Sequence, residues 1–311
     1  MNIKITLLVN KIAGNGNAEI IFNKTIKILK HRNIPYTVME STYPGELISL
    51  AQTYANQSHS NQEFLLVIGG DGSFNQVLNG IKTSLHPCTP IAYLPAGTGN
   101  DFARAANLPA SPPKVIASLC TNPKIQTIDC GKFTLDNSHW QYFVNNFGIG
   151  FDAYIVHKSN HGFFKKVLNK IRLGKLVYVS NLISALNNQD NFKIIIKTPS
   201  QKYHFNNTYF VTTTNHPYFG GGVPILPSAN LRSHILNAVV VEKPSLKKFI
   251  ILFAHLLKDG SHVKDPHFHN IGGKEIQITT YNPEYGQIDG DDTKKQPFQI
   301  TFQIDHFNLI H

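Results

Sequence analysis

The stretch FLLVIGGDGSFNQVLNG, residues 64–80, decides the fold, because an apolar run leads into a glycine-rich loop and then into a helical pattern. The same order returns in IAYLPAGTGNDFAR, residues 91–104. In each case a strand would be followed by a loop rich in glycine, which has no Cβ atom, and then by the start of a helix. Exposed backbone N–H groups and the helix dipole favour the binding of an anion there. The two loops therefore predict a phosphate-binding site in an α/β domain.

Each loop also contains an aspartate, Asp71 in the first and Asp101 in the second. A carboxylate there would repel a triphosphate unless a divalent cation lay between them, so the pattern indicates Mg²⁺. Taken singly, Asp71 could belong to a tight turn and Asp101 to a helix N-terminus, as in any α/β protein. The P-loop pattern GxxxxGK[ST] is absent from the sequence, which disfavours an ordinary P-loop NTPase.

At these residues the chain resembles a family, the bacterial diacylglycerol kinases and YegS-like lipid kinases, whose catalytic domain is shared with sphingosine and ceramide kinases. GGDG at residues 69–72 would also suit NAD kinases, but GTGNDFAR at residues 97–104 is typical of the diacylglycerol kinase branch. The resemblance implies a Rossmann-like α/β nucleotide-binding domain, of the NAD kinase and phosphofructokinase type, in residues 1–131. It implies a mainly β sandwich domain in residues 132–311, which would bind the lipid and carry the catalytic aspartate.

By the same resemblance the glycine-rich loops bind ATP. Asn10 and Gly14, in LLVNKIAGNG, match a phosphate-contacting loop after the first strand, although Asn15 stands where a basic residue often follows. Thr42, in STYPGELISLAQ, matches a segment beside the nucleotide, and a plain helix cap is the alternative. The implied nucleotide-binding residues are Asn10, Gly14, Thr42, Gly69, Gly70, Asp71, Gly72, Ser73, Asn75, Gly97, Thr98 and Asn100.

The resemblance also implies a metal set and a base. Asp129, in IDCG, matches a strand aspartate that joins those of the glycine loops around Mg²⁺, so Asp71, Asp101 and Asp129 are assigned jointly to the metal. In QIDGD, residues 287–291, Asp289 matches the general base for the lipid hydroxyl, and Asp291 replaces a glutamate as its catalytic neighbour. An ordinary aspartate suffices, because a loose phosphoryl-transfer transition state needs positioning more than early proton removal. Outside that context the segment would be an acidic turn.

Two further segments depart from simple expectations. Arg232, Ser233 and Asn237 lie where magnesium-stabilised bacterial members carry acidic residues for a structural metal. Because these side chains are poor ligands for a hard divalent ion, we expect that metal to be absent and Arg232 or packing to replace it. In FGIGFDA, residues 147–153, the glycine spacing resembles a dinucleotide fingerprint but lacks its βαβ context, so we interpret it as a decoy.

Charge indicates an acidic partner. The formal net charge is +10, with 15 histidines in addition. The Lys158–Lys175 stretch combines basic residues with an apolar stripe at helical spacing, which favours an anionic membrane surface, while a surface helix packed on the core is an equal alternative. The sequence contains none of the common recognition motifs for nucleic acid, so nucleic acid is not expected as a partner. A homodimer is compatible with the sequence.

The sequence predicts a cytoplasmic protein, because its three cysteines show no pairing pattern and it has neither an apolar run of membrane length nor a signal-peptide pattern. Together with the basic stretch, this predicts reversible association with membranes. Short strands are expected at residues 3–9, 36–40, 64–68 and 91–94, alternating with helices at 18–32 and 46–56. Later runs predict strands at 142–146, 192–197, 205–214, 235–241, 276–280 and 298–304, with helices at 163–186 and 246–257. One last strand should make only minimal contact with the first domain.

The predicted function is an ATP-dependent lipid kinase that phosphorylates the primary hydroxyl of diacylglycerol or a related neutral lipid. A catalytically weak pseudokinase or lipid-binding protein is the second hypothesis, motivated by the changes at Asn15, Arg232 and Asp291. A kinase with a soluble acceptor, such as NAD, shares GGDG but is disfavoured by the NDFAR segment.

Overall fold

The computed structural model describes residues 3–60, 62–135, 138–161 and 189–311, and the side chains of residues 159–161 are outside this description. The helix expected at residues 163–186 and most of the Lys158–Lys175 stretch lie outside the described residues. In the part of the chain that is described, no helix is long and apolar enough to cross a membrane.

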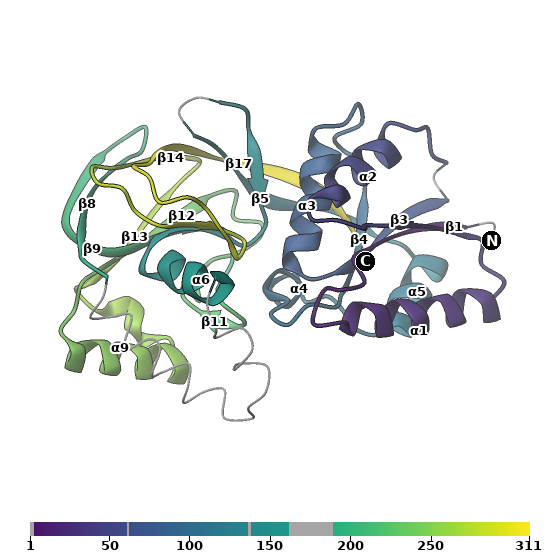
Figure 1. Cartoon of the computed structure of the whole chain (residues 1–311), viewed down its shortest axis with the longest axis horizontal. Coiled ribbons are helices and arrows are strands. Elements are labelled where there is room, and N and C mark those ends of the chain that lie inside the picture. The colour runs from purple at the N-terminus through teal and green to yellow at the C-terminus, as the bar shows by residue number, and fades with distance from the viewer. Residues whose placement is uncertain (1–2, 61, 136–137, 162–188) are drawn as a thin grey trace.

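The first domain is built on parallel strands in the order β4-β3-β1-β2 (Figure 1). Val9 pairs with Ile68, and Ile68 pairs with Leu94, so the carboxyl ends of three strands meet at one edge. These strands are buried almost throughout because helices cover both faces of the sheet. The elements are β1 (Lys4–Val9), α1 (Asn17–His31), β2 (Tyr36–Glu40), α2 (Glu46–Ala55), β3 (Glu63–Gly69), α3 (Asp71–Lys82), β4 (Ile91–Pro95), α4 (Asp101–Ala105) and α5 (Pro112–Thr121).

Two hydrophobic clusters flank this sheet. One includes residues of α2 and α3, and the other includes residues of α1 and α5. The alternation of strands and helices predicted from the sequence is therefore confirmed here, with the glycine-rich loops at the carboxyl edge.

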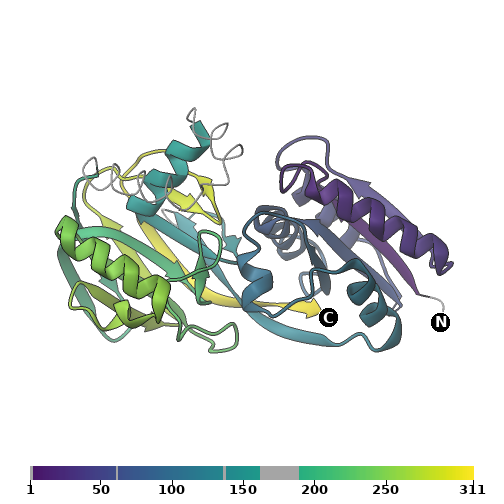
Figure 2. The same ribbon diagram turned by 90° about the horizontal axis from the view of Figure 1, so that it is seen from below.

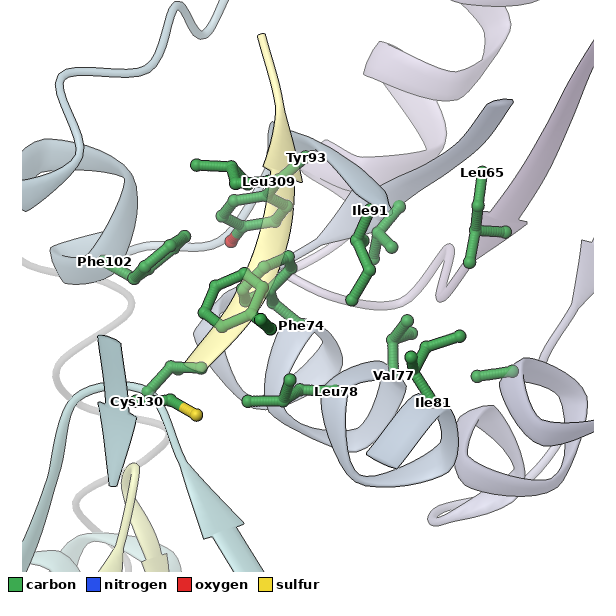
Figure 3. Close-up of a cluster of buried hydrophobic side chains, with 14 of the residues drawn as sticks. Leu65, Phe74, Val77, Leu78, Ile81, Ile91, Tyr93, Phe102, Cys130 and Leu309 are labelled. Carbon is green, nitrogen blue, oxygen red and sulfur yellow. The ribbon is translucent and has the colours of Figure 1, made fainter. Parts of the chain in front are cut away.

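Two long strands run from one domain into the other. β5 (Ile125–Leu135) and β17 (Gln299–Ile310) pair antiparallel over eleven residue pairs, and Figures 1 and 2 show the C-terminal strand reaching the first domain. There Leu309 pairs with Ile91 of β4 in parallel and packs beside Tyr93 and Phe74 (Figure 3). The boundary expected after residue 131 thus falls inside a strand, and the C-terminal contact is larger than expected.

The second domain is a mainly β sandwich, as expected. Its inner core includes Phe133, Phe147 and Phe302. A second cluster contains Phe151 and Tyr209 and lies under α6 and α9. Its elements are β6 (Gln141–Phe143), β7 (Asn146–Gly150), α6 (Phe151–His161), β8 (Phe192–Lys197), β9 (Lys202–Thr214), β10 (Tyr218–Phe219), β11 (Val223–Pro224), β12 (Leu236–Glu242), α9 (Leu246–Lys258), the 3₁₀ helix η1 (Ser261–Lys264), β13 (Phe268–Gly273), β14 (Glu275–Thr280), β15 (Gly286–Ile288) and β16 (Asp291–Asp292).

Candidate active site

A cleft of about 480 Å³ lies where the glycine-rich loops of the first domain face the second domain. Its two parts differ in chemistry. The loops and several polar side chains form one part, and aliphatic and aromatic side chains form the other. Of the residues predicted for the site, the cleft is lined by Gly14, Gly70, Asp71, Gly72, Gly97, Thr98, Asp101 and Asp289.

The glycine-rich loops are packed backbone against backbone. Gly14 has a φ of +61°, and a Cβ atom there would strike the carbonyl of Ala96. A Cβ atom on Gly97 would lie 2.6 Å from the Cα atom of Gly70. Only glycine fits at these crossings, so peptide groups rather than side chains form this wall, as an anion-binding surface requires.

Asp71 and Asp101 hold these loops in place. Asp71 accepts backbone hydrogen bonds from Asp101 at 3.0 Å and from Phe102 at 3.3 Å, which caps the start of α4. Asp101 accepts a bond of 2.8 Å from the N–H of Gly221 and pairs with Arg104 at 3.2 Å. Burial raises the pKa of both carboxyl groups, and the charge of Asp101 raises that of Asp71 further. Two adjacent desolvated carboxylates fit a divalent cation, which would offset their repulsion.

Asp129 lies apart from this pair. It is 3% exposed, and His234 donates to it through its backbone N–H at 2.7 Å and contacts it through Nδ1 at 2.9 Å. It is not among the cleft-lining residues. In the described ranges, no group of three or more His, Cys, Asp or Glu side chains could hold a metal, so the three aspartates assigned to Mg²⁺ are not gathered as one ligand set.

The segment at residues 232–237 makes hydrogen bonds to β5. His234 has a φ of 56°, in the left-handed region. It contacts both carboxylate oxygens of Asp129. Arg232 instead donates to Gln126 at 2.8 Å. The sequence predicted that Arg232 or packing would replace the metal, and the contact with Asp129 comes from His234, two residues after Arg232.

Asp289 occupies a two-residue hairpin turn between β15 and β16. Both Asp289 and Gly290 have positive φ, 50° and 94°, as a type I′ turn requires. The Asp289 carboxyl accepts four hydrogen bonds. Three come from the backbone N–H groups of residues 144–146 at 2.8–2.9 Å, and one comes from the Asn75 amide at 2.5 Å. Those three peptides separate β6 from β7, which is why the strand expected at residues 142–146 is split.

Burial raises the pKa of Asp289 to about 6, and its four donors only partly offset this effect. The carboxyl is therefore ionised at neutral pH and close to its titration range. A group with this pKa can accept a proton at neutral pH, which is the property required of a general base.

Asn145 connects the loops of the first domain with the turn of the second. Its backbone N–H donates to Asp289 at 2.9 Å, and its side chain hydrogen-bonds Asp71. Nε2 of buried His216 lies 2.8 Å from Oδ1 of Asn145. Burial lowers the pKa of His216 to about 3, so the ring is neutral and Nε2–H donates, which fixes the orientation of the amide.

Asp152 is a site residue that sequence reasoning missed. It lines the cleft, is 8% exposed, and accepts a hydrogen bond from Gln287 at 3.2 Å through Oδ2. No hydrogen bond from the described residues reaches Oδ1. Burial raises the pKa of the carboxyl to about 6, and the Gln287 amide and the backbone N–H groups of residues 152 and 153 lower it only in part. The signal was present in FGIGFDA. A Cβ atom on Gly148 would collide with the Asp152 carboxylate, so the glycine spacing makes room for this acid.

Among the described residues, the apolar side chains that line the cleft all belong to the second domain. Its walls come from α6, β9, β10, β11 and the inner face of α9. The side chains are Phe151, Ile155, Val156, Phe210, Phe219, Val223, Ile225, Phe249, Phe253 and Leu256.

Several predicted site residues act beside the cleft rather than in its lining. Asn10 donates to Ser73 at 3.5 Å, and Asn100 exchanges hydrogen bonds with the backbone of Gly97, so they hold the loops together. Thr42 donates to the carboxylate of Glu46, the first residue of α2, through both its backbone N–H and its hydroxyl, whereas the N-cap of α2 is Gly45. The remaining predicted residues outside the lining are Gly69, Asn75 and Asp291, the last of which is exposed.

Comparisons with known proteins agree with this arrangement. A family model described as the diacylglycerol kinase catalytic domain matches residues 4–133, and one described as the YegS C-terminal NAD kinase β-sandwich-like domain matches residues 148–311. A Bacillus subtilis protein named "Putative lipid kinase YtlR" is 29% identical over 296 residues, which cover 94% of each chain. A Mycobacterium tuberculosis protein named as a diacylglycerol kinase is 25% identical over 261 residues, 84% of this chain and 80% of its own.

Solved structures show the same fold. The crystal structure of a Bacillus anthracis protein titled as a diacylglycerol kinase superposes with a TM-score of 0.72 at 24% identity, covering 99% of this chain and 96% of that one. Yeast NADH kinase, solved with NADH, superposes with a TM-score of 0.55 at 9% identity, covering 99% and 83%. The predicted kinship between the first domain and NAD kinases is confirmed at the level of fold.

Proposed function

Because the chain belongs to the family of bacterial diacylglycerol and YegS-like lipid kinases, we propose that it transfers the γ-phosphoryl group of ATP to a hydroxyl of diacylglycerol or a related neutral lipid. Membership of this family supports a kinase, which is a transferase that uses a nucleotide. The proposal concerns the acceptor, the metal and the roles of individual residues.

The observation that carries the proposal is the change of chemistry along the cleft. Glycine-rich loops and carboxylates form one part, and ten apolar side chains form the other. Asp152 and Asp289 belong to the polar lining of the second domain, together with Gln287. A substrate with a hydroxyl on a polar head and an apolar tail matches both parts, whereas a dinucleotide acceptor would leave the apolar walls without a partner.

In the proposed reaction the lipid hydroxyl oxygen forms a bond to the γ-phosphorus, and the bond from that phosphorus to the β,γ-bridging oxygen breaks to release ADP. The hydroxyl proton passes to Asp289. Asp71 and Asp101 are the residues that would hold Mg²⁺, which would supply charge neutralisation at the phosphates. Binding both substrates in one cleft removes the entropic cost of bringing them together.

Asp289 needs a free lone pair to receive that proton. Each of its oxygens already accepts two hydrogen bonds, and three of the four donors are backbone groups fixed between two strands. The Asn75 amide is the side-chain donor of the four, and it comes from the first domain. We therefore assign Asn75 to positioning Asp289 and to releasing one oxygen by rotation, rather than to contact with the nucleotide.

The test is transfer of labelled γ-phosphate from ATP with Mg²⁺ to a panel of lipids in mixed micelles, with NAD as a soluble acceptor in a parallel reaction. Label should enter a neutral lipid, and Asp289→Asn should reduce the rate about 10²- to 10⁴-fold, the usual range for loss of a general base. ATP binding by both proteins, measured by calorimetry, would show that the variant retains its first domain.

Label in NAD and in no lipid would refute the lipid acceptor. ATP binding without transfer to any lipid would instead favour the pseudokinase hypothesis. Transfer to a lipid that survives in Asp289→Asn would leave the kinase in place and remove Asp289 as its base.

A further inference from the structure

α9 presents an apolar face to the outside of the second domain. Leu246, Ile250, Ile251 and Leu257 are 44%, 52%, 49% and 60% exposed, whereas an ordinary surface helix keeps such residues toward the core. Ser245 caps the start of the helix, because its side chain accepts a hydrogen bond from the N–H of Lys248. In Figure 1 it runs along the lower edge of the second domain, and Figure 2 shows it from below.

The opposite face of the same helix forms a wall of the cleft. Phe249, Phe253 and Leu256 line its apolar part. At 3.6 residues per turn, Ile250 and Leu257 lie on the helix surface next to Phe253, three or four positions away. Apolar surface therefore continues around the helix, from the interior of the cleft to the exterior of the protein.

The charged side chains within α9 are all basic. α9 contains no acidic residue, and Lys247, His255 and Lys258 are exposed among the aliphatic side chains. Lys248 is engaged inward by Asp265. An exposed helix with aliphatic residues interleaved with lysines matches the interfacial region of an anionic bilayer, where apolar chains and phosphate groups lie within a few ångströms of each other.

We propose that the outward face of α9 docks on an anionic phospholipid membrane, with Ile250, Ile251 and Leu257 inserted among the acyl chains and Lys247 and Lys258 at the headgroups. The purpose of docking rests on the proposed lipid kinase function, because it would bring the apolar part of the cleft to the bilayer that holds the substrate. A second copy of this chain fits the same face less well, since two copies would bring the lysines of α9 together.

The test uses the full chain and sedimentation with vesicles of phosphatidylcholine alone or of phosphatidylcholine and phosphatidylglycerol in equal parts. Wild type should bind the mixed vesicles and bind the neutral ones weakly. The variant Ile250→Asn/Ile251→Asn/Leu257→Asn should lose about tenfold or more in vesicle affinity, because three inserted aliphatic side chains are removed. The matched control is Ile20→Asn/Leu85→Asn/Ile125→Asn, which changes residues that are equally or more exposed but scattered over the first domain.

Insertion can be measured directly. Trp140 is the single tryptophan, so Trp140→Phe with Ile251→Trp places one fluorophore on α9. Brominated acyl chains should quench its emission, and should not quench a tryptophan placed at Leu85 in the same background. If the triple variant is unstable on thermal unfolding, Lys247→Glu/Lys258→Glu provides the second variant, which should lose binding to mixed vesicles alone.

Vesicle binding equal in wild type and the α9 variants, or absent in wild type, would overturn the docking proposal. So would a wild-type dimer that the triple variant converts to a monomer, since α9 would then be an interface between copies. Activity on a water-soluble short-chain diacylglycerol separates the two proposals. The triple variant should retain it and lose activity on vesicles, whereas vesicle binding through α9 in a protein without any lipid phosphorylation would refute only the kinase acceptor.

Discussion

Replacing Asp152 with asparagine should stabilise the protein at neutral pH, and the advantage should disappear in mild acid. The carboxyl is buried and accepts one hydrogen bond from a side chain, that of Gln287, and Oδ1 has no hydrogen-bond partner among the described residues. Burial therefore raises its pKa from 3.8 to about 6. An ionised carboxylate in this position opposes folding, and asparagine keeps the shape and one acceptor oxygen without the charge.

The magnitude follows from proton linkage. Above pH 6 the carboxyl is ionised in both the folded and the unfolded protein, so stability does not change with pH on its account. Between the two pKa values the folded protein binds a proton that the unfolded chain lacks, so wild type gains stability as the pH falls, and Asp152→Asn does not. From about pH 7.5 to about pH 4.5 this difference amounts to about 2 kcal/mol.

The quantity to measure is the difference in unfolding free energy between wild type and Asp152→Asn, compared at the two pH values. Effects of the substitution that do not depend on pH, such as an amide donor left without a partner, cancel in this comparison. Urea unfolding of both proteins at the two pH values, followed by the fluorescence of Trp140, measures it. Asp190→Asn is the control. Because Asp190 is exposed, the stability of this variant should depend on pH as that of wild type does. Parallel pH dependence of wild type and Asp152→Asn, within about 0.5 kcal/mol, would refute the desolvation argument.

Three further predictions concern the cleft. The rate of lipid phosphorylation at saturating MgATP should rise with pH through an apparent pKa of about 6, because Asp289 must be ionised to accept a proton. Asn75→Ala should move that rise to higher pH, since it removes a donor that lowers the pKa, and an unchanged profile would exclude the contact. Gly97→Ala should weaken ATP binding about tenfold or more in calorimetry, because its Cβ atom would lie 2.6 Å from Gly70 Cα. Gly72→Ala meets no atom within 4 Å, so equal losses from both substitutions would contradict the packing argument.

The first domain could be predicted because its information is local. Each glycine-rich loop follows its strand directly and precedes its helix, so the order of a few residues fixes both the fold and the edge where the loops meet. The family was also readable, since GTGNDFAR separates branches that share GGDG. The helix at 246–257 was predicted from its pattern and is present as α9, but the pattern did not reveal that both of its faces would be apolar.

The surroundings of Asp289 could not be predicted, because its donors are some 140 positions or more away along the chain. No pattern near residue 289 indicates that three backbone groups between two distant strands will hold its carboxylate. Asp152 was missed for another reason. The glycines of FGIGFDA were compared with a dinucleotide fingerprint, and their role in admitting a neighbouring carboxylate was not considered. The nucleotide contacts assigned to individual loop residues stay predictions.

The return of β17 to the first domain ties the folding of that domain to the order of synthesis. Phe307 and Leu309 pack in the core on one face of its sheet, and Ile310 packs in the core on the other. A ribosome would release β1 to β4 long before these residues, so β4 would remain an open strand edge while the second domain is made. The first domain can therefore complete its fold only after the second domain has been synthesised. A fragment ending at residue 133 would carry the nucleotide loops with an unpaired edge and incomplete cores, which favours aggregation over binding.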